Sequence, residues 1–466
     1  MGEIYMKLFV APSKNSAEHH SRMTEAPVGP LIISLAIPTI ISMLVTTLYN
    51  TADTYFVSQL GTSASGAVGV VFSLMAIFQA IGFTLGMGSG SMIARVLGAG
   101  ESGTASVYGS TSFFSAITMG IILCMGGLLF LDQLMTLLGS TPTILPYARS
   151  YASWILLGAP IMCASFVMNN ILRSEGHAAF AMCGLVTGGL LNIALDPIFI
   201  FTLGLGISGA ALATLLSQCI SFSIMISFFL RGKSLVKLHL KNLSHKPRTY
   251  FDIVRLGCPS LSRQGLASIS TAALNVNAAA YGDPAVAAMS IVGRIFLFIL
   301  SVMIGLGQGF SPVVGYNYGS RRYRRVREAF WFTVKTGMVL MAFMTLAGWI
   351  FAPEIIALFR KEDAVVIAIG TRAMRFQCSV LLLQPLFVTT NMMLQAAGFA
   401  WRATFLACTR QGIYFIPLIA LLPGLFGLTG VEMTQTVSDI FSFTTSLPFL
   451  YYFIMMLKEK ERFQQR

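Results

Sequence analysis

Charged residues are scarce in this chain. They make up 11% of its 466 residues, whereas soluble domains carry about 25%. Apolar residues reach 55% and come in blocks of 20 or more. A helix of that length crosses a hydrocarbon layer about 30 Å thick. The composition therefore excludes a soluble globular domain and predicts an integral membrane protein.

Other signals are missing as well. Membrane β-strands alternate in polarity over about ten residues, and because no such alternation occurs here, the spans are expected to be helices. None of the seven cysteines forms a CxxC pair, which argues against a metal site or a disulfide framework. No nucleophile–base constellation is visible, and the five histidines lie in the tail or loops. We therefore do not expect an enzyme.

Twelve apolar blocks are each expected to form a transmembrane helix. Their ranges are 31–57, 66–94, 104–130, 148–171, 178–203, 208–230, 252–280, 285–317, 327–351, 364–397, 403–426 and 430–457. The 30 residues before the first block lack the apolar core and cleavage site of a signal peptide. They are expected to be a polar cytoplasmic tail.

Basic residues fix the expected orientation. If the N-terminal tail is inside, 21 of the 31 Lys and Arg residues fall in inside segments, and the outside loops hold only Arg360 and Lys361. This asymmetry follows the positive-inside rule. Both termini are thus expected in the cytoplasm, with the chain in the plasma (inner) membrane of a bacterium or archaeon. The same rule accounts for the net charge of +13, so no nucleic-acid partner is expected.

The two halves of the chain resemble each other at a shift of about 221 residues. "LAIPTIIS" (35–42) matches "LGCPSLSR" (256–263), and "GMGSG" (86–90) matches "GLGQG" (305–309). Six spans per half is an even number, so both copies enter the membrane from the same side. The prediction is all-α: twelve helices in two six-helix lobes, related by a pseudo-two-fold axis along the membrane normal. The expected parts are an N-terminal cytoplasmic tail, an N-lobe, a basic cytoplasmic linker, a C-lobe and a C-terminal cytoplasmic tail, at 1–30, 31–230, 231–251, 252–457 and 458–466.

Such parallel halves are typical of transporters whose lobes rock around a central site. The motifs "PTIIS" and "NTADTYFVSQLG" in the first span, "GMGSG" in the second, and "LNIALDPIFI" with "GISGAALAT" in the fifth and sixth make the resemblance specific. Over about residues 28–457 the chain resembles the multidrug and toxic compound extrusion (MATE) family. The resemblance implies efflux of small compounds in exchange for a cation.

Acidic side chains inside the spans break the symmetry of the repeat. Asp53 corresponds to Leu274 and Asp196 to Pro417. Carboxylates needed by the fold alone would be expected in both halves. An Asp at a helix centre costs about 2.5–3.5 kcal/mol and commonly serves an ion or proton. The asymmetry predicts an ion-binding task in the first half.

Four side chains form the predicted site: Asp53, Asn192, Asp196 and Thr214. Asn192 and Asp196 are four residues apart and share a helix face, and Pro197 favours a bend beside them. The set offers two carboxylates and two neutral oxygens for a hard cation such as Na⁺, or a shared proton. The alternatives to ion binding are structural: Asp196 stabilises a helix bend, and Asp53 is a capping group near the outer interface. The resemblance matches the four positions to the N-lobe cation site of prokaryotic relatives, without choosing between Na⁺ and H⁺.

Three further residues are candidates for a substrate cavity: Tyr49, one turn before Asp53, and Asn169 with Asn170 in the fourth span. Hydrogen bonding between helices is an equal alternative for the two asparagines. Pro38 is a candidate hinge of the first span, or a static bend, since Pro259 stands at the matching position.

The second half carries charges of its own. Arg263 and Arg294 are expected to pair with Glu432 and Asp439, although a role in substrate binding stays open. Some relatives carry acids in the seventh and tenth spans, and this chain has none in "RQGLASISTAALNVNAAA" (263–280) of the seventh or in "FQCSVLLLQPLFVTTNMMLQAAG" (376–398) of the tenth. A second cation site is therefore in doubt.

The sequence thus predicts a monomeric secondary antiporter, surrounded by membrane lipid, that exports amphipathic, cationic compounds in exchange for H⁺ or Na⁺. It needs no cofactor beyond that ion. One alternative is a flippase for lipid-linked precursors or phospholipids, which Arg263 and Arg294 would suit. Another is a non-transporting receptor or channel subunit.

Overall fold

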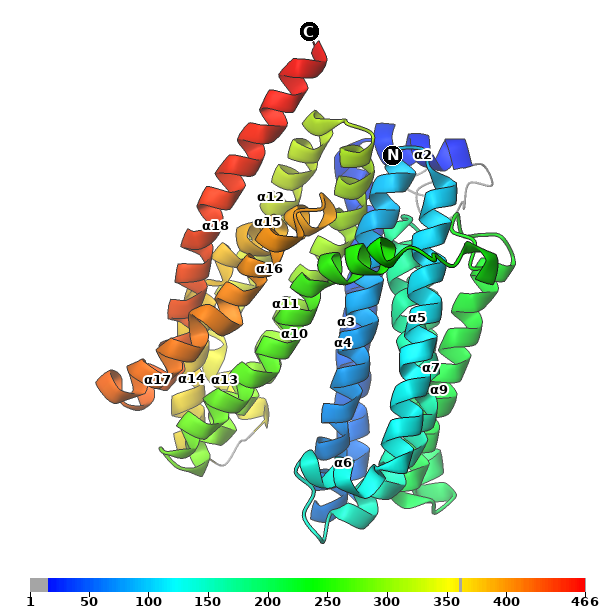
Figure 1. Ribbon diagram of the computed structural model, residues 1–466. Coiled ribbons are helices and arrows are strands. Elements are labelled where there is room, and N and C mark those ends of the chain that lie inside the picture. The colour runs from blue at the N-terminus through cyan, green and yellow to red at the C-terminus, as the bar shows by residue number, and fades with distance from the viewer. Residues whose placement is uncertain (1–15, 360–362, 466) are drawn as a thin grey trace. The chain divides into compact units, whose positions relative to one another are not determined.

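The computed structural model describes residues 16–359 and 363–465, and every regular element in these ranges is a helix (Figure 1). The predicted tail residues 1–15, the outside residues Arg360 and Lys361, and Arg466 lie outside the described ranges. The α-helices are α2 (Ser16–Glu25), α3 (Val28–Ser58), α4 (Thr62–Gly98), α5 (Ser102–Leu129), α6 (Leu131–Leu137), α7 (Leu145–Ser174), α8 (Ala178–Pro197), α9 (Gly206–Leu230), α10 (Pro247–Ala279), α11 (Asp283–Gly319), α12 (Tyr323–Ile350), α13 (Ala352–Phe359), α14 (Ala364–Ser379), α15 (Gln384–Ala396), α16 (Ala400–Cys408), α17 (Phe415–Phe426) and α18 (Leu428–Gln465). Short π- or 3₁₀-helical turns are η1 (Ile198–Thr202), η2 (Leu240–Asn242), η3 (Leu381–Leu383) and η4 (Thr409–Ile413).

Eleven helical runs among the described residues are long and apolar enough to cross a membrane, and they coincide with eleven of the twelve predicted blocks. The remaining block, 252–280, lies in α10, which is 33 residues long. Its length is sufficient, but Arg263, Gln264 and Asn275 make it more polar than the other spans. The predicted C-terminal tail continues α18 as a helix.

Two of these runs contain a π-helical turn at related places. In the first half α8 ends at Pro197 and η1 follows it; in the second half α16 runs into η4. Proline removes a backbone donor from the ladder, and π-turns occur frequently at functional sites. The α-helical ladder changes at Pro197, where the bend was predicted, and the bend itself stays a prediction.

The chain forms two compact units, each a helical bundle. Unit 1 comprises 1–25 and 37–257, and unit 2 comprises 26–36 and 258–466. The predicted lobes, 31–230 and 252–457, follow the order of the chain, whereas these units exchange short segments. As a result α3 and α10 are each divided between the units, two residues before Pro38 and two residues before Pro259.

Within each unit, long helices pack along their length, as α4, α5, α7 and α9 do in unit 1 (Figure 1). The repeat recurs in detail: Asn169 Nδ2 donates to the carbonyl oxygen of Ala181 over 3.3 Å, and Asn391 Nδ2 donates to that of Ala403 over 2.7 Å. Both residues of the second pair are shifted by 222 positions. A hydrogen bond between consecutive spans is thus repeated in the second half.

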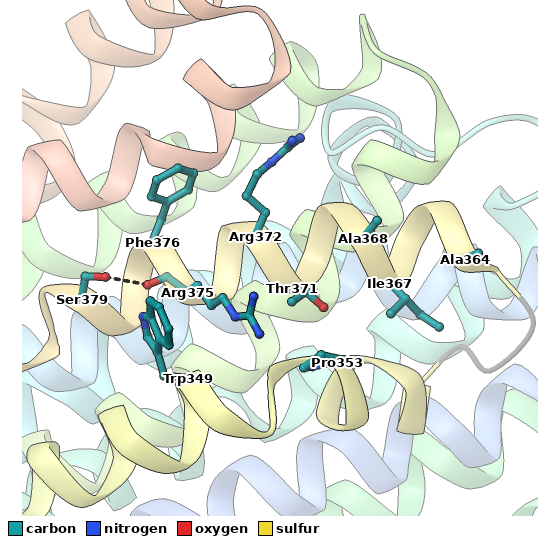
Figure 2. Close-up of a pocket in the computed structure, with 10 residues that line it drawn as sticks. All are labelled: Trp349, Pro353, Ala364, Ile367, Ala368, Thr371, Arg372, Arg375, Phe376 and Ser379. Atoms are coloured by element: carbon teal, nitrogen blue, oxygen red, sulfur yellow. Dashed lines mark hydrogen bonds between the residues drawn. The ribbon is translucent and has the colours of Figure 1, made fainter.

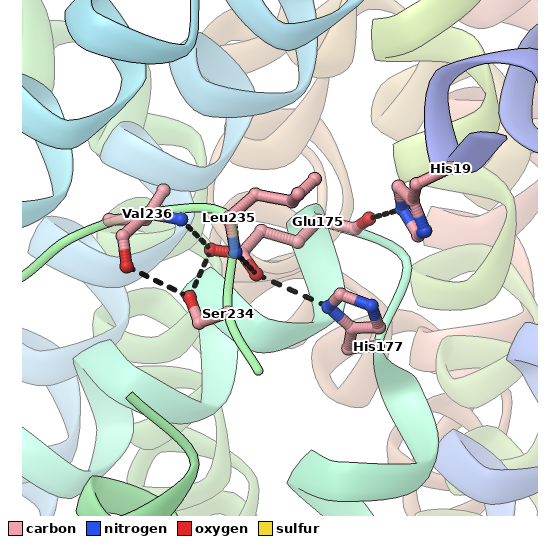
Figure 3. A network of polar contacts seen from close by, with 6 residues as sticks. All are labelled: His19, Glu175, His177, Ser234, Leu235 and Val236. Carbon is pink, nitrogen blue, oxygen red and sulfur yellow. Dashed lines mark hydrogen bonds and ion pairs between the residues drawn. The ribbon is translucent and has the colours of Figure 1, made fainter. Parts of the chain in front are cut away.

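A buried carboxylate, that of Glu175, accepts hydrogen bonds from the segment that follows α9 in unit 1 (Figure 3). Glu175, fully buried after the end of α7, accepts hydrogen bonds from Ser234 Oγ over 2.7 Å and from the backbone N–H groups of Leu235 and Val236 over 3.1 and 3.0 Å. These donors belong to the segment predicted as a basic linker. Charge-assisted bonds of this kind are stronger than neutral ones, so this network holds the segment against the bundle.

Helix α2 packs beside Glu175 through the side chain of His19. This ring is 1% exposed, and its Nε2 donates to the carbonyl oxygen of Glu175 over 2.5 Å. The ring centroid lies 4.6 Å from that of His177, whose Nδ1 is 3.3 Å from Glu175 Oε2. Helix α2 is therefore docked on unit 1 by a neutral histidine.

Acid is expected to release α2. Burial, and then the neighbouring His177, lowers the pKa of His19 from 6.5 to about 3. A detached helix would regain the higher value and bind the proton, so docking is complete above pH 6.5 and weakens as the pH falls below it. We expect hydrogen exchange of residues 16–25, corrected for the intrinsic rate, to increase about tenfold from pH 7.5 to 5.5. The variant His19→Gln retains an N–H donor but does not titrate, and an equal pH response in it would refute the role of His19.

Candidate functional site

Unit 1 brings the four predicted oxygen-bearing side chains together, from α3, α8 and α9. Asn192 Nδ2 donates to Asp196 Oδ1 over 3.2 Å and lies 3.3 Å from Thr214 Oγ1. Asp53 lies near enough to Asp196 for the two charges to repel. The predicted spacing of Asn192 and Asp196 on one helix face is confirmed, since both side chains are buried and bonded to each other.

Several acceptor atoms of this cluster are left without a donor. Among the described residues, Asp53 Oδ1, Asn192 Oδ1 and Asp196 Oδ2 are buried and accept no hydrogen bond. Asp196 itself is 0% exposed. Buried polar atoms are nearly always paired, because an unpaired one costs about 1–3 kcal/mol. Three unpaired oxygens in one cluster are the arrangement that a proton or a hard cation would satisfy.

Tyr151 of α7 joins the cluster, and the sequence reasoning missed it. Its hydroxyl donates to Asp53 Oδ2 over 3.3 Å, it also interacts with Thr214 and Asp196, and the side chain is 1% exposed. A signal was present: at the shift of 222 that relates α7 to the second half, the matching residue is Ala373. A polar side chain that occurs in one half of the repeat and is missing at the matching position of the other marks this hydroxyl group as it marks Asp53 and Asp196.

The three candidates for a substrate cavity differ in their contacts: Tyr49 packs against a neighbouring helix, and the two asparagines form hydrogen bonds. Tyr49 is half-buried and packs against α8, where a Cβ on Gly189 would lie 3.2 Å from Tyr49 Cδ1. Asn169 makes the hydrogen bond between spans described above. Asn170 donates to the carbonyl oxygen of Phe166 over 2.8 Å and accepts from Arg173 over 3.1 Å. These bonds give both asparagines a packing role, and a role in a cavity stays a prediction.

The predicted ion pairs of the second half are wrong in their partners. Glu432 pairs with Arg372, whose Nη2 is 2.7 Å from Glu432 Oε1. Asp439 pairs with Arg410 over 2.7 Å. Each acid is thus occupied by an arginine of another helix in unit 2, a partner that sequence spacing could not identify.

Unit 2 also has a groove of 670 Å³ between α14 and the end of α12 with α13 (Figure 2). The guanidinium of Arg375 lies over the ring of Trp349, 5.3 Å from its centroid. Among residues 16–359 and 363–465, no carboxylate and none of the predicted site residues lines this groove. It is separate from the acidic cluster of unit 1.

A metal centre of the usual protein-ligand kind is not found in the part of the chain that the structure describes, where no group of three or more His, Cys, Asp or Glu side chains comes together. A cation at the acidic cluster would therefore combine two carboxylates with neutral oxygens. Alkali and other hard cations accept such ligands.

Comparison with known proteins gives a consistent result. The profile of the MatE family matches the chain twice, at residues 38–198 and 259–421, which repeats the internal symmetry. The multidrug export protein MepA of Staphylococcus saprophyticus is 27% identical over 409 residues, 88% of this chain and 90% of the relative. MepA of Staphylococcus haemolyticus is 28% identical over 432 residues, 92% of this chain and 94% of the relative.

Solved structures of membrane transporters also match this chain. An outward-facing multidrug resistance MATE family transporter matches with a TM-score of 0.89 and 30% identity, over 94% of this chain and 98% of that one. A MOP superfamily transporter from Pyrococcus furiosus matches with a TM-score of 0.88 and 29% identity, over the same shares. The expected fold class, an all-α integral membrane protein of two six-helix lobes, is thereby confirmed. The two profile matches together span well over half of the sequence, and the chain belongs to the MATE family of membrane transporters, which are not enzymes.

Proposed function

We propose that this protein is a secondary active antiporter that exports amphipathic, cationic compounds in exchange for H⁺ or Na⁺. The observation that carries the proposal is the set of three unpaired buried oxygens on Asp53, Asn192 and Asp196. The Staphylococcus relatives are multidrug export proteins, which supports export of drug-like compounds. No cofactor enters the cycle apart from the coupling ion.

The chemistry of the cycle follows from charge. When the acidic cluster faces outward, Asp53 and Asp196 bind the ion, which lowers their combined negative charge by one and weakens their attraction for a bound organic cation. The cation leaves, and the ion is carried inward. Inward movement of one positive charge gains about 2.3 kcal/mol per 100 mV of membrane potential. Tyr151 positions Asp53 through its hydroxyl, and Thr214 completes the oxygen set.

Alternating access arises from the two six-helix lobes, residues 31–230 and 252–457. Pro38 acts as a hinge, because it has no backbone N–H to donate and stands where α3 is divided between the units. Tyr49, Asn169 and Asn170 line the substrate cavity of the N-lobe. The protein works as a monomer in the plasma membrane with both termini in the cytoplasm.

Proteoliposomes containing the purified protein test the coupling. A pH gradient and a Na⁺ gradient are imposed in separate experiments, and uptake of a fluorescent cationic dye is followed. We expect one of the two gradients to drive uptake and an ionophore for that ion to abolish it. Dye accumulation that is the same with and without either gradient would refute ion coupling.

A further inference from the structure

The groove of Figure 2 lies entirely within unit 2, between α14 on one side and Trp349 with Pro353 on the other. Its height in the membrane follows from the length of α12. Tyr323, in the basic run "RRYRRVR" (321–327), and Trp349 stand near opposite ends of this helix, and at 1.5 Å per residue they are about 39 Å apart. A bilayer with its headgroup layers is about 40–45 Å thick. With the basic run at one interface, the groove lies at the other, where tryptophan is enriched.

Two polar side chains of α14 lie on the face that borders this groove. Figure 2 shows Thr371 and Arg375, four residues apart, on the side of Pro353 and Trp349, whereas Arg372 points away. The guanidinium of Arg375 lies over the ring of Trp349, 5.3 Å from its centroid. Attraction between the cation and the ring holds this charge at the level of the interface.

The hydroxyl of Thr371 is available to a ligand. Its Oγ1 is buried and has no hydrogen-bond partner among residues 16–359 and 363–465. Thr333 of α12, by contrast, donates to the carbonyl oxygen of Ala329 over 2.8 Å, the bond that helical threonines commonly form. A buried hydroxyl without a partner is unfavourable unless another molecule satisfies it. A hydroxyl and a guanidinium side by side are donors that suit the oxygens of a phosphate.

The charge of the groove favours an anion. Arg372 also lines it, but the carboxylate of Glu432, which is fully buried, pairs with this arginine over 2.7 Å and compensates its charge. Among the described residues no carboxylate lines the groove, so the positive charge of Arg375 is not compensated there. The ammonium group of a zwitterionic lipid would find no acceptor beside it. Arg375 is exposed, as contact with a membrane lipid requires.

Exposed apolar surface continues from the groove along α12. Val339, Phe343 and Leu346 are exposed, and their spacing of four and then three residues places them on one helix face, which Trp349 extends by three more. Acyl chains cover such a face in a bilayer. The occupant therefore needs an anionic head at Arg375 and a hydrocarbon tail along α12, and a soluble phosphate has only the first of these.

We propose that the groove binds an anionic phospholipid of the phosphatidylglycerol type, with Arg375 and Thr371 donating hydrogen bonds to its phosphate. The lipid is a resident partner of unit 2 and is not cargo. With both termini in the cytoplasm, the basic run faces inward and the lipid belongs to the outer leaflet. The inference rests on the proposed function only in this choice of leaflet.

Trp349 reports on the lipid that lies against it. The chain has four tryptophans, and replacing Trp154, Trp331 and Trp401 by phenylalanine leaves Trp349 alone. Full-length protein with these changes is reconstituted into bilayers that contain brominated phosphatidylglycerol or brominated phosphatidylcholine, and quenching of its fluorescence gives the relative binding constant of the two lipids. We expect phosphatidylglycerol to bind about fivefold more tightly, the effect of one arginine near an anionic surface. Arg375→Gln should lower this ratio to about one, and Thr371→Val, which keeps the shape, to a value between.

Arg149→Gln is the matched control, because it removes an exposed arginine of unit 1 that lies outside the groove. It should leave the ratio unchanged. In every variant, quenching by brominated phosphatidylcholine shows that Trp349 still contacts lipid, so misfolding is recognised. A ratio near one before Arg375 is changed, or a ratio that Arg375→Gln preserves, would overturn the proposal.

A soluble anion is the other candidate for the groove. If glycerol phosphate, added at constant ionic strength, removed the preference for phosphatidylglycerol, the groove would bind soluble phosphates and the lipid would be ruled out. The bilayers are symmetric and no gradient is imposed. A failure of ion coupling or of the proposed orientation would therefore leave this result intact.

Discussion

Efflux by Asp196→Asn is expected to fall to the level of cells that lack the transporter. The side chain is 0% exposed, and its Oδ2 has no donor among the described residues. An amide of the same shape can neither release a proton nor neutralise a cation, and it adds an N–H₂ group to the cluster. Asp53→Asn should have the same effect, because both carboxylates are needed if they share one ion. Dye efflux from energised cells that express each variant measures the loss.

Two further variants make this result interpretable. Asp132→Asn is the same chemical change in the same unit, at a residue outside the acidic cluster whose side chain is 48% exposed and paired with Arg149 over 3.5 Å, and it should retain full efflux. Tyr151→Phe removes the hydroxyl that donates to Asp53 and should reduce efflux without abolishing it. Protein levels in the membrane are compared for all of them. Drug efflux retained by both Asp variants would contradict a role of the acidic cluster in coupling.

Glu175→Ala is expected to cause a large loss of stability. The change leaves three donors, Ser234 Oγ and the N–H groups of Leu235 and Val236, without their acceptor. Each unsatisfied buried donor costs about 1–3 kcal/mol, so the loss for three donors is about 3–9 kcal/mol in total. A domain is commonly stable by only about 5–15 kcal/mol. We therefore expect a marked fall in thermal unfolding temperature in detergent and in the yield of monodisperse protein.

The matched control for this change is Glu328→Ala. Glu328 forms an exposed pair with Arg324, with side chains 47% and 76% exposed, and exposed pairs contribute about 0–1 kcal/mol. Its unfolding temperature should be close to that of the wild type. If Glu175→Ala unfolded at the same temperature as Glu328→Ala, the network at Glu175 would not stabilise unit 1.

The sequence predicted the helices well because their signals are local. A long apolar run must be helical in a membrane, so the blocks at 66–94 and 285–317 lie within α4 and α11. Pro197 acts on its own turn, and α8 gives way to the π-helical turn η1 directly after it, inside the block predicted at 178–203. The acids of the cluster were found from their cost in an apolar span together with the asymmetry of the repeat. Each of these inferences needs only the residue and its neighbours in the chain or, for the acids, the matching position of the repeat.

What the sequence could not supply are partners from distant segments. Arg410 and Asp439 are 29 residues apart, and Arg372 and Glu432 are 60 apart. Only packing of the helices decides that these arginines, and not Arg263 or Arg294, reach the acids. The role of Tyr151 in the cluster has the same origin, because its partner Asp53 is 98 residues away.

The division of α3 and α10 between the two units has a consequence for the chain as a whole. Residues 26–36 lie between the two segments of unit 1 in the sequence but belong to unit 2, and residues 247–257 follow the loop after α9 but belong to unit 1. If the chain were severed between α9 and α10, each fragment would retain a stretch of the other's bundle and lack one of its own. Neither fragment is self-sufficient, so the two halves are expected to mature only when they are made together, although each carries a complete copy of the repeat.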